Sequence, residues 1–209
     1  MEIKAKRRYE INKGNKHFDV QRLENPMVYA GELCNVQEEA FSAYPNKYRP
    51  TVDREKFKDT VAEWNKCDCY VYGAFSRKNN RLCGYAFLKK EEGILHFNVL
   101  KTCPESEKNA VNAAIVYKIL QDFNAYLGSE FYICDGARNI VHETHFQEYL
   151  EKYFGFRKAY CNLHLKYNPK LEWLFLSLYR FRKIMKKFDS IGLIHKINAV
   201  FNIHEITRR

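Results

Sequence analysis

The chain has 209 residues, a length that suits one compact domain with an additional segment. Its apolar fraction of 46% and its aromatic fraction of 15% can supply a core, which excludes an intrinsically disordered protein. The net charge of +10 is unevenly placed, because residues 170–209 hold nine Lys or Arg and three Asp or Glu and so carry +6 of it. The basicity is therefore mainly a property of the C-terminal tail.

The seven cysteines are an odd number and stand mostly inside apolar runs, where a thiol behaves as a small hydrophobic group. The charged N-terminus has no apolar signal segment, and no apolar run is long enough to span a membrane. We therefore expect a reduced, cytoplasmic protein. Cys67 and Cys69 do not have a zinc-site spacing, so we expect no metal.

The first part of the chain predicts a polar extension followed by two helices. Residues 1–30 form a basic N-terminal extension, with a short edge strand at His17–Leu23. Apolar residues at helical spacing then predict a helix over Gly31–Ala43. A second helix is predicted over Thr51–Trp64, with Asp53 as its N-cap.

The middle of the chain predicts three strands in quick succession. They cover Cys69–Ser76, Leu82–Lys89 and Ile94–Leu100, and they are rich in aromatic and β-branched residues. Short polar turns connect them, as in an antiparallel meander.

After the meander the apolar spacing changes from two to about four residues. This pattern predicts a long helix over Ser106–Leu127 that crosses back to a strand at Phe131–Cys134, parallel to the strand before it. A helix over Glu143–Tyr153 and a final strand over Arg157–Tyr167 complete the predicted order.

This order predicts a mixed α/β fold (α+β in its mixed sheet), and two short segments add local detail. Gly84 precedes a tyrosine in the second meander strand, and Glu151–Arg157 reads EKYFGFR between the last helix and strand. In these features residues 31–169 resemble the GCN5-related N-acetyltransferase (GNAT) superfamily. The Cys103-Pro104 stretch before a helix is similar to the Fem-type aminoacyltransferase-like branch. The resemblance implies a central mixed sheet with an antiparallel meander, two N-terminal helices and a crossover helix.

The resemblance implies a transferase that moves an acetyl or aminoacyl group to an amine such as an amino sugar or amino acid. Acyl-CoA or aminoacyl-tRNA would be the donor, and cell-wall or surface-polysaccharide biosynthesis would be a suitable setting. The family's pyrophosphate loop usually reads [QR]-x-x-G-x-[GA], whereas residues 101–110 contain no glycine. This loop favours the alternative, a catalytically silent domain of the same fold that binds a ligand or a partner.

The third meander strand offers two catalytic candidates. N-acyl transfer needs a group that takes a proton from the amine and donors that polarise the carbonyl. His96 and Asn98 alternate with the apolar Leu95, Phe97 and Val99, so both can face a substrate groove. The alternative is that this face is merely exposed to solvent.

Three further residues are catalytic candidates. Asp135 follows a buried strand, where open α/β sheets place ligand-binding groups. The resemblance also implies a tyrosine general acid near the last helix, which is Tyr149 or Tyr153. Aromatic packing is the alternative for both tyrosines.

Further binding candidates lie before and after the predicted strand at Phe131–Cys134. Arg138 can hold a carboxylate or phosphate in fork geometry, with Asn139 beside it and His142 as a further substrate contact. The alternatives are a tight turn with a surface arginine and a polar helix entry. The cofactor-binding candidates implied by the family loop are Leu100, Lys101, Ser106, Lys108 and Asn109.

The tail, residues 170–209, predicts an amphipathic basic helix from Leu171 to Phe188, followed by a second apolar segment over Ile191–Ile203. Three interpretations remain open. The tail packs on its own domain or on a partner subunit, as in a homodimer. It lies on a membrane surface as a peripheral anchor through residues 171–203. It binds nucleic acid, although we expect no such partner except a tRNA donor.

Overall fold

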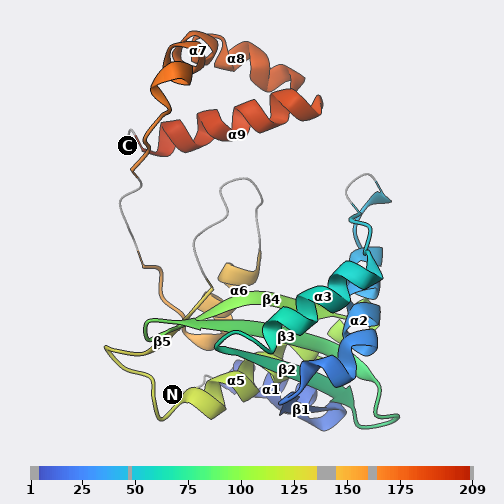
Figure 1. Ribbon diagram of the computed structural model, residues 1–209. Coiled ribbons are helices and arrows are strands. Elements are labelled where there is room, and N and C mark those ends of the chain that lie inside the picture. The colour runs from blue at the N-terminus through green and yellow to red at the C-terminus, as the bar shows by residue number, and fades with distance from the viewer. Residues whose placement is uncertain (1–4, 47–48, 136–144, 160–163, 208–209) are drawn as a thin grey trace. The chain divides into compact units, whose positions relative to one another are not determined.

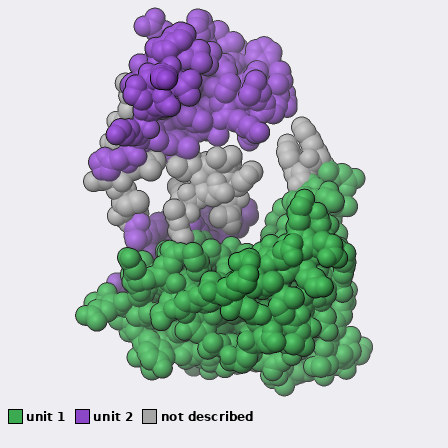
Figure 2. Space-filling model, in the orientation of Figure 1, with its two compact units in different colours: residues 1–136 green, residues 137–209 purple. Residues whose placement is uncertain are grey.

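The computed structural model describes residues 5–46, 49–135, 145–159 and 164–207 (Figure 1). The chain divides into two compact units, residues 1–136 and 137–209 (Figure 2). The first unit holds a mixed sheet between helices, and the described part of the second is helical.

The sheet has five strands in chain order. The first four are antiparallel neighbours, and the fifth runs parallel to the fourth. The predicted edge strand, meander and parallel strand are therefore confirmed. The strands are β1 (Phe18–Arg22), β2 (Cys69–Ser76), β3 (Leu82–Glu91), β4 (Ile94–Thr102) and β5 (Tyr132–Cys134).

One face of the sheet is covered by the two predicted helices, α2 (Ala30–Ser42) and α3 (Arg54–Trp64), after a short 3-10 turn, η1 (Pro26–Tyr29). The Asp53 side chain accepts a hydrogen bond of 3.2 Å from the Lys56 amide, so the predicted N-cap is confirmed. The Trp64 ring stacks on a phenylalanine of β3 with 4.6 Å between centroids, which fixes α3 on the sheet.

The opposite face is covered by α5 (Val111–Phe123). The Tyr72 hydroxyl of β2 donates a 3.0 Å hydrogen bond to Asp122 of α5, whereas the neighbouring Val71 packs in the core beneath α2 and α3. Successive strand residues point to opposite faces, so the two helix layers sandwich the sheet. A helix that the sequence did not predict, α1 (Ala5–His17), packs on α5.

The predicted long helix over Ser106–Leu127 is wrong in its extent. The structure has a short helix, α4 (Pro104–Glu107), and then α5, which ends at Phe123. Ala110 separates them with φ 61°, a left-handed conformation that interrupts a right-handed helix. Gly14 of α1 lies against this point, because an added Cβ would be 2.6 Å from the Ala110 carbonyl oxygen.

The second unit contains the predicted helix near Tyr153 and the tail. The predicted strand over Arg157–Tyr167 is not observed, because residues 157–159 and 164–167, its described parts, have no strand structure. Most of these side chains are exposed, so a packed face that would hold a strand is missing there. The elements are α6 (His145–Phe154), α7 (Pro169–Tyr179), α8 (Arg182–Met185), η3 (Lys186–Phe188) and α9 (Gly192–Ile206).

The tail folds as a helical hairpin, residues 169–206, rather than as one helix to Phe188. The Phe201 side chain of α9 is fully buried, with ring centroids 5.5 Å from Phe175 and 5.4 Å from Tyr179 of α7. This hairpin, called the tail hairpin below, therefore has an aromatic core of its own. Among the described residues no helix has the length and apolar character needed to cross a membrane.

We predict that Gly14→Ala lowers the free energy of unfolding by about 1–3 kcal/mol, because the new methyl group overlaps the Ala110 carbonyl. Gly31→Ala, on α2, is the matched control, since a Cβ there meets no atom within 4 Å. It should be neutral or stabilising by about 0.5–1 kcal/mol. Urea unfolding followed by circular dichroism measures both changes. Equal stability of the two variants would contradict the close packing of α1 on α5.

Candidate functional site

The two edges of β4 are paired to different extents. On one side β4 is paired with β3 from Ile94 to Thr102. On the other side its pairing with β5 covers three residues and ends at His96, opposite Cys134. Within the described residues, the second half of β4 therefore has one strand neighbour instead of two. Backbone groups on such an edge are available to a ligand.

A β-bulge lies where this pairing ends. Phe97 is opposite Leu88 and Val99 is opposite Phe87, so Asn98 between them has no opposite residue on β3. Phe97 is buried, and Asn98 is exposed. The expected alternation of Leu95, Phe97 and Val99 is wrong, because the bulge shifts Val99 to the face that packs beneath α2 and α3.

His96 stands at the end of the paired part of β4. It lies opposite Lys89 on β3 and Cys134 on β5, and its side chain is 27% exposed. Its Nε2 atom is 3.9 Å from a carboxylate oxygen of Glu91. His96 is thus a half-buried imidazole that lies near a carboxylate and two residues before the bulge.

Lys101, near the end of β4, interacts with the end of α2. Its ammonium group lies 4.8 Å from the Phe41 ring centroid and 5.6 Å from that of Tyr44, and it is 3.4 Å from the Tyr44 hydroxyl. These contacts hold the cation over aromatic rings. Leu100, the neighbouring candidate, is half-buried opposite Ala86.

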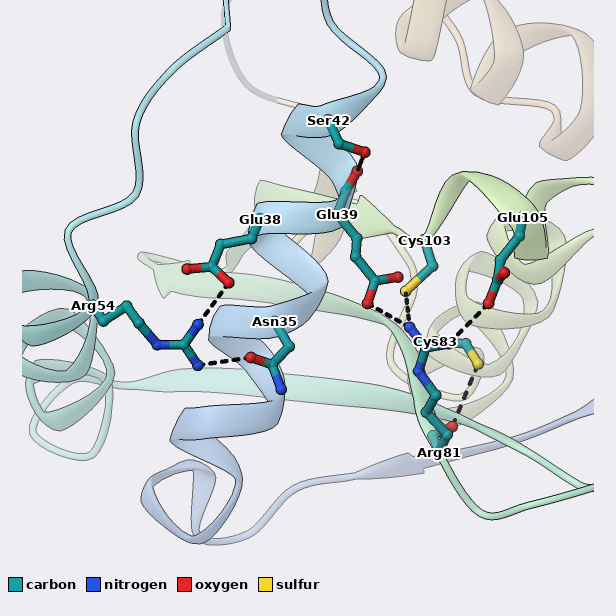
Figure 3. A network of polar contacts seen from close by, with 9 residues as sticks. All are labelled: Asn35, Glu38, Glu39, Ser42, Arg54, Arg81, Cys83, Cys103 and Glu105. Carbon is teal, nitrogen blue, oxygen red and sulfur yellow. Dashed lines mark hydrogen bonds and ion pairs between the residues drawn. The ribbon is translucent and has the colours of Figure 1, made fainter.

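The chain that leaves β4 is held by Arg81, which precedes β3 (Figure 3). Its guanidinium pairs with Glu39 of α2 and, at 2.9 Å, with Glu105 of α4, and it lies 4.0 Å from the Cys103 sulfur. One cation thus joins α2, the start of β3 and the loop. Glu107, the second acid of this loop, accepts a 3.3 Å hydrogen bond from Thr102. Both loop carboxylates are therefore engaged within the protein.

Cys103 is fully buried directly after β4, and its amide donates a 2.9 Å hydrogen bond to the Cys83 carbonyl. Burial, followed by its contact with Glu39, raises the pKa of the Cys103 thiol from its ordinary value to about 12. This thiol is therefore protonated near neutral pH. It acts as a packing group of the loop and is unsuited to act as a nucleophile.

A basic pocket of about 450 Å³ opens next to the same loop. Three of the five predicted cofactor-binding residues line it, namely Ser106, Lys108 and Asn109, whereas Leu100 and Lys101 do not. The other lining residues come from the end of α1, the start of β1, the β2–β3 turn with the strand ends beside it, and α4. Five of the lining side chains are cationic. The cations are Lys16, Arg77, Lys78, Arg81 and Lys108, and the acid is Glu105.

The remaining candidates lie elsewhere. Tyr149 and Tyr153 are both on α6 in the second unit, with ring centroids 5.1 Å apart. Asp135 is half-buried directly after β5. Arg138, Asn139 and His142 lie outside the described residues. The catalytic or binding roles of all these residues stay predictions. In the described part of the chain no group of His, Cys, Asp or Glu is placed to hold a metal ion.

Sequence reasoning missed the residues that depend on tertiary contacts. Arg81 and Glu39 are 42 positions apart and carry no local pattern. The polar turn at 77–80 was predicted only as a connection, yet Arg77 and Lys78 bring two of the pocket's cations. The excess of basic residues in this turn was the signal that could have indicated a role in anion binding.

No family model and no curated protein matches the sequence. Solved structures match in fold. AAC(6')-Iy, in complex with a bisubstrate analogue, has a TM-score of 0.50 at 9% identity over 73% of this chain and 99% of its own. An aminoglycoside acetyltransferase from an uncultured soil metagenomic sample has a TM-score of 0.50 at 14% identity over 74% of this chain and 99% of its own. The fold is that of the GNAT acetyltransferases. A possible acetyltransferase from Clostridium difficile 630 agrees, with a TM-score of 0.50 at 6% identity over 73% of this chain and 98% of its own.

The GNAT fold confirms the predicted fold class and the coarse resemblance. At these identities the similarity concerns the arrangement of elements and does not carry over the roles of individual residues. The chemistry therefore has to be argued from the contacts of this chain.

We predict that Cys103 resists alkylation in the folded protein. With a thiol pKa of about 12 instead of 9.0, its thiolate fraction at mildly alkaline pH is about three orders of magnitude smaller than in the unfolded chain. Iodoacetamide labelling, resolved by peptide mass spectrometry, should therefore be at least ~100-fold slower for the Cys103 peptide in buffer than in concentrated guanidinium chloride. Similar rates in both states would show that the thiol is open to solvent.

Proposed function

We propose that this protein is an N-acyltransferase that moves an acyl group from acyl-CoA to the amine of a small molecule. The single observation that carries the proposal is that, among the described residues, β4 is paired on one side only beyond His96, next to a bulge at Asn98. A strand edge of this kind offers backbone N–H and C=O groups to an extended donor such as the pantetheine arm of CoA. It also places polar side chains at the point where the edge opens.

The roles of the two β4 side chains follow from their positions. His96 is half-buried and lies near Glu91, so it would take the proton that an attacking amine loses, directly or through one water. The exposed Asn98 amide and the bulged backbone around it would donate hydrogen bonds to the acyl oxygen as negative charge develops there. The catalytic roles of Tyr149 and Tyr153, on α6 of the second unit, stay predictions.

The charge of the basic pocket supports a phosphorylated donor. Lys16, Lys78 and Lys108 have no ion-pair partner among the described residues, whereas the pocket's Glu105 is already paired with Arg81. Cations without internal partners attract the phosphates of a CoA molecule.

The acceptor class is an amine, and an amino sugar is our first choice. One matched structure is an aminoglycoside acetyltransferase, and aminoglycosides carry amino sugars. An amino sugar acceptor would also suit cell-wall or surface-polysaccharide metabolism. The Fem-type relationship and an aminoacyl-tRNA donor stay predictions.

A second candidate function is a catalytically silent domain of the same fold. One observation favours it: residues 101–110 contain no glycine, and two carboxylates, Glu105 and Glu107, stand in this loop. Such a domain would bind a ligand at the basic pocket or the β4 edge without turnover.

The test combines calorimetric titration with CoA and a mass-spectrometric assay of CoA release from acetyl-CoA in the presence of glucosamine. We predict that Lys108→Glu weakens CoA binding about tenfold, since a phosphate contact is lost. His96→Gln should bind CoA normally and lower turnover ~100-fold or more. The matched control is Lys58→Glu, an exposed residue of α3 outside the pocket, which should change neither quantity.

The outcomes separate the two candidates. Binding of CoA without any amine-dependent release would favour the silent domain. An absence of CoA binding at millimolar ligand would contradict the acyl-CoA proposal. Normal turnover by His96→Gln would show that His96 is not the proton acceptor, but it would not affect the proposed CoA-binding site.

A further inference from the structure

The outer surface of the tail hairpin is apolar. Large hydrophobic side chains on all of its helices and at the turn before α9 are exposed by at least 42%. Trp173 on α7 and Leu193 at the start of α9 are the most open, at 67% and 70%. The full set is Leu171, Trp173, Leu174, Leu176, Phe181, Ile184, Phe188, Ile191, Leu193, Val200 and Ile206.

These exposed side chains are additional to the hairpin's own core. Phe175, Tyr179 and Phe201 already form an aromatic cluster between α7 and α9. The Arg182 guanidinium of α8 pairs with Glu205 of α9 at 3.1 Å, which adds a polar link between the helices. The hairpin is thus closed internally and still presents an apolar exterior. So many exposed large apolar side chains on one small unit indicate a surface that binds something.

Cations lie among the exposed apolar groups. Five Lys or Arg residues of the hairpin have no ion-pair partner among the described residues. Of its three acids, Asp189 and Glu205 are bonded within it, which leaves the exposed Glu172 as one carboxylate against these five cations. The outward charge is therefore basic, in agreement with the net +6 of residues 170–209. The five are Lys170, Arg180, Lys183, Lys187 and Lys196.

A surface with exposed apolar side chains and unpaired cations requires a partner that is both apolar and anionic. Hydrocarbon chains accept the Leu, Ile and Phe side chains, and anionic headgroups accept the ammonium and guanidinium groups. Trp173 has the amphipathic ring that is enriched at membrane interfaces, and lysine stems can lie along apolar surface while their charges reach the headgroups. A second copy of the chain or the first unit would cover the apolar area, but neither is complementary to the basic surplus.

We propose that the tail hairpin binds the surface of an anionic lipid bilayer, with α7 and α9 lying along the interface and Trp173 inserted among the acyl chains. This inference does not depend on the acyltransferase chemistry of the first unit. It assigns the hairpin the task of holding the protein at a membrane surface, where lipid-linked or membrane-bound amine acceptors would be concentrated.

The experiment uses the intrinsic fluorescence of Trp173 in the full-length chain. The sequence has two tryptophans, and Trp64→Phe removes the buried one while keeping an aromatic ring on Phe87. Vesicles of phosphatidylcholine with phosphatidylglycerol should shift the Trp173 emission to shorter wavelength and sediment the protein. Pure phosphatidylcholine vesicles should give at least ~10-fold weaker binding, as should anionic vesicles at high salt.

A pair of charge reversals makes the test specific. Lys183→Glu with Lys187→Glu removes two cations of the hairpin and should lower the vesicle partition coefficient at least ~30-fold. Lys58→Glu on α3 with Lys66→Glu in the turn after it changes the net charge equally in the first unit and should leave binding within about twofold of the parent. Equal losses in both pairs would overturn the proposal, because they would reflect net charge and not the hairpin.

Two other results would also overturn it. An unchanged Trp173 emission with every vesicle, in a protein that sediments as a dimer, would assign the surface to a second copy. The same emission in a monomer would show that the surface packs on the chain's own first unit. Circular dichroism of each variant confirms that the helices remain folded.

Discussion

The arrangement of the first unit depends on β4, a strand with two unequal edges. One edge is paired with β3 from Ile94 to Thr102, and in the described part of the chain the other is paired with β5 only as far as His96. The bulge at Asn98 stands two residues beyond the last pair that β4 makes with β5. A rigid strand with an accessible edge is a preorganised surface for an extended ligand.

The surrounding contacts keep this edge in place. α2 and α5 pack on opposite faces of the sheet. α1 packs on α5, where Gly14 lies against Ala110 and Ala114. Arg81 joins α2 to the loop after β4, so the loop cannot move without breaking two ion pairs. Each exposed pair is weak alone, but the shared guanidinium couples them. The basic pocket and the β4 edge are thus held on one rigid scaffold.

The sequence was sufficient for elements that are specified locally and insufficient for features that depend on packing. The meander, α2 and α3 follow from apolar periodicity and the Asp53 cap, and all are observed. The break at Ala110 could not be predicted, because alanine favours helix and only the contact with Gly14 holds the left-handed conformation. The bulge likewise leaves no trace in the alternation of β4. The sequence indicated Ser106, Lys108 and Asn109 as cofactor-binding residues, and they line the basic pocket. The sequence did not indicate their cationic neighbours, because these come from segments distant in sequence.

Hydrogen–deuterium exchange of the full-length protein with and without acetyl-CoA tests the central claim most directly. If the open edge of β4 binds the acyl donor, peptides that cover Phe97–Thr102 and residues 103–110 should exchange at least ~10-fold more slowly with the ligand. Peptides from α3, none of whose residues lines the pocket, and from the tail hairpin should be unchanged. Protection confined to segments other than β4 and its loop, or no protection at saturating acetyl-CoA, would contradict the account.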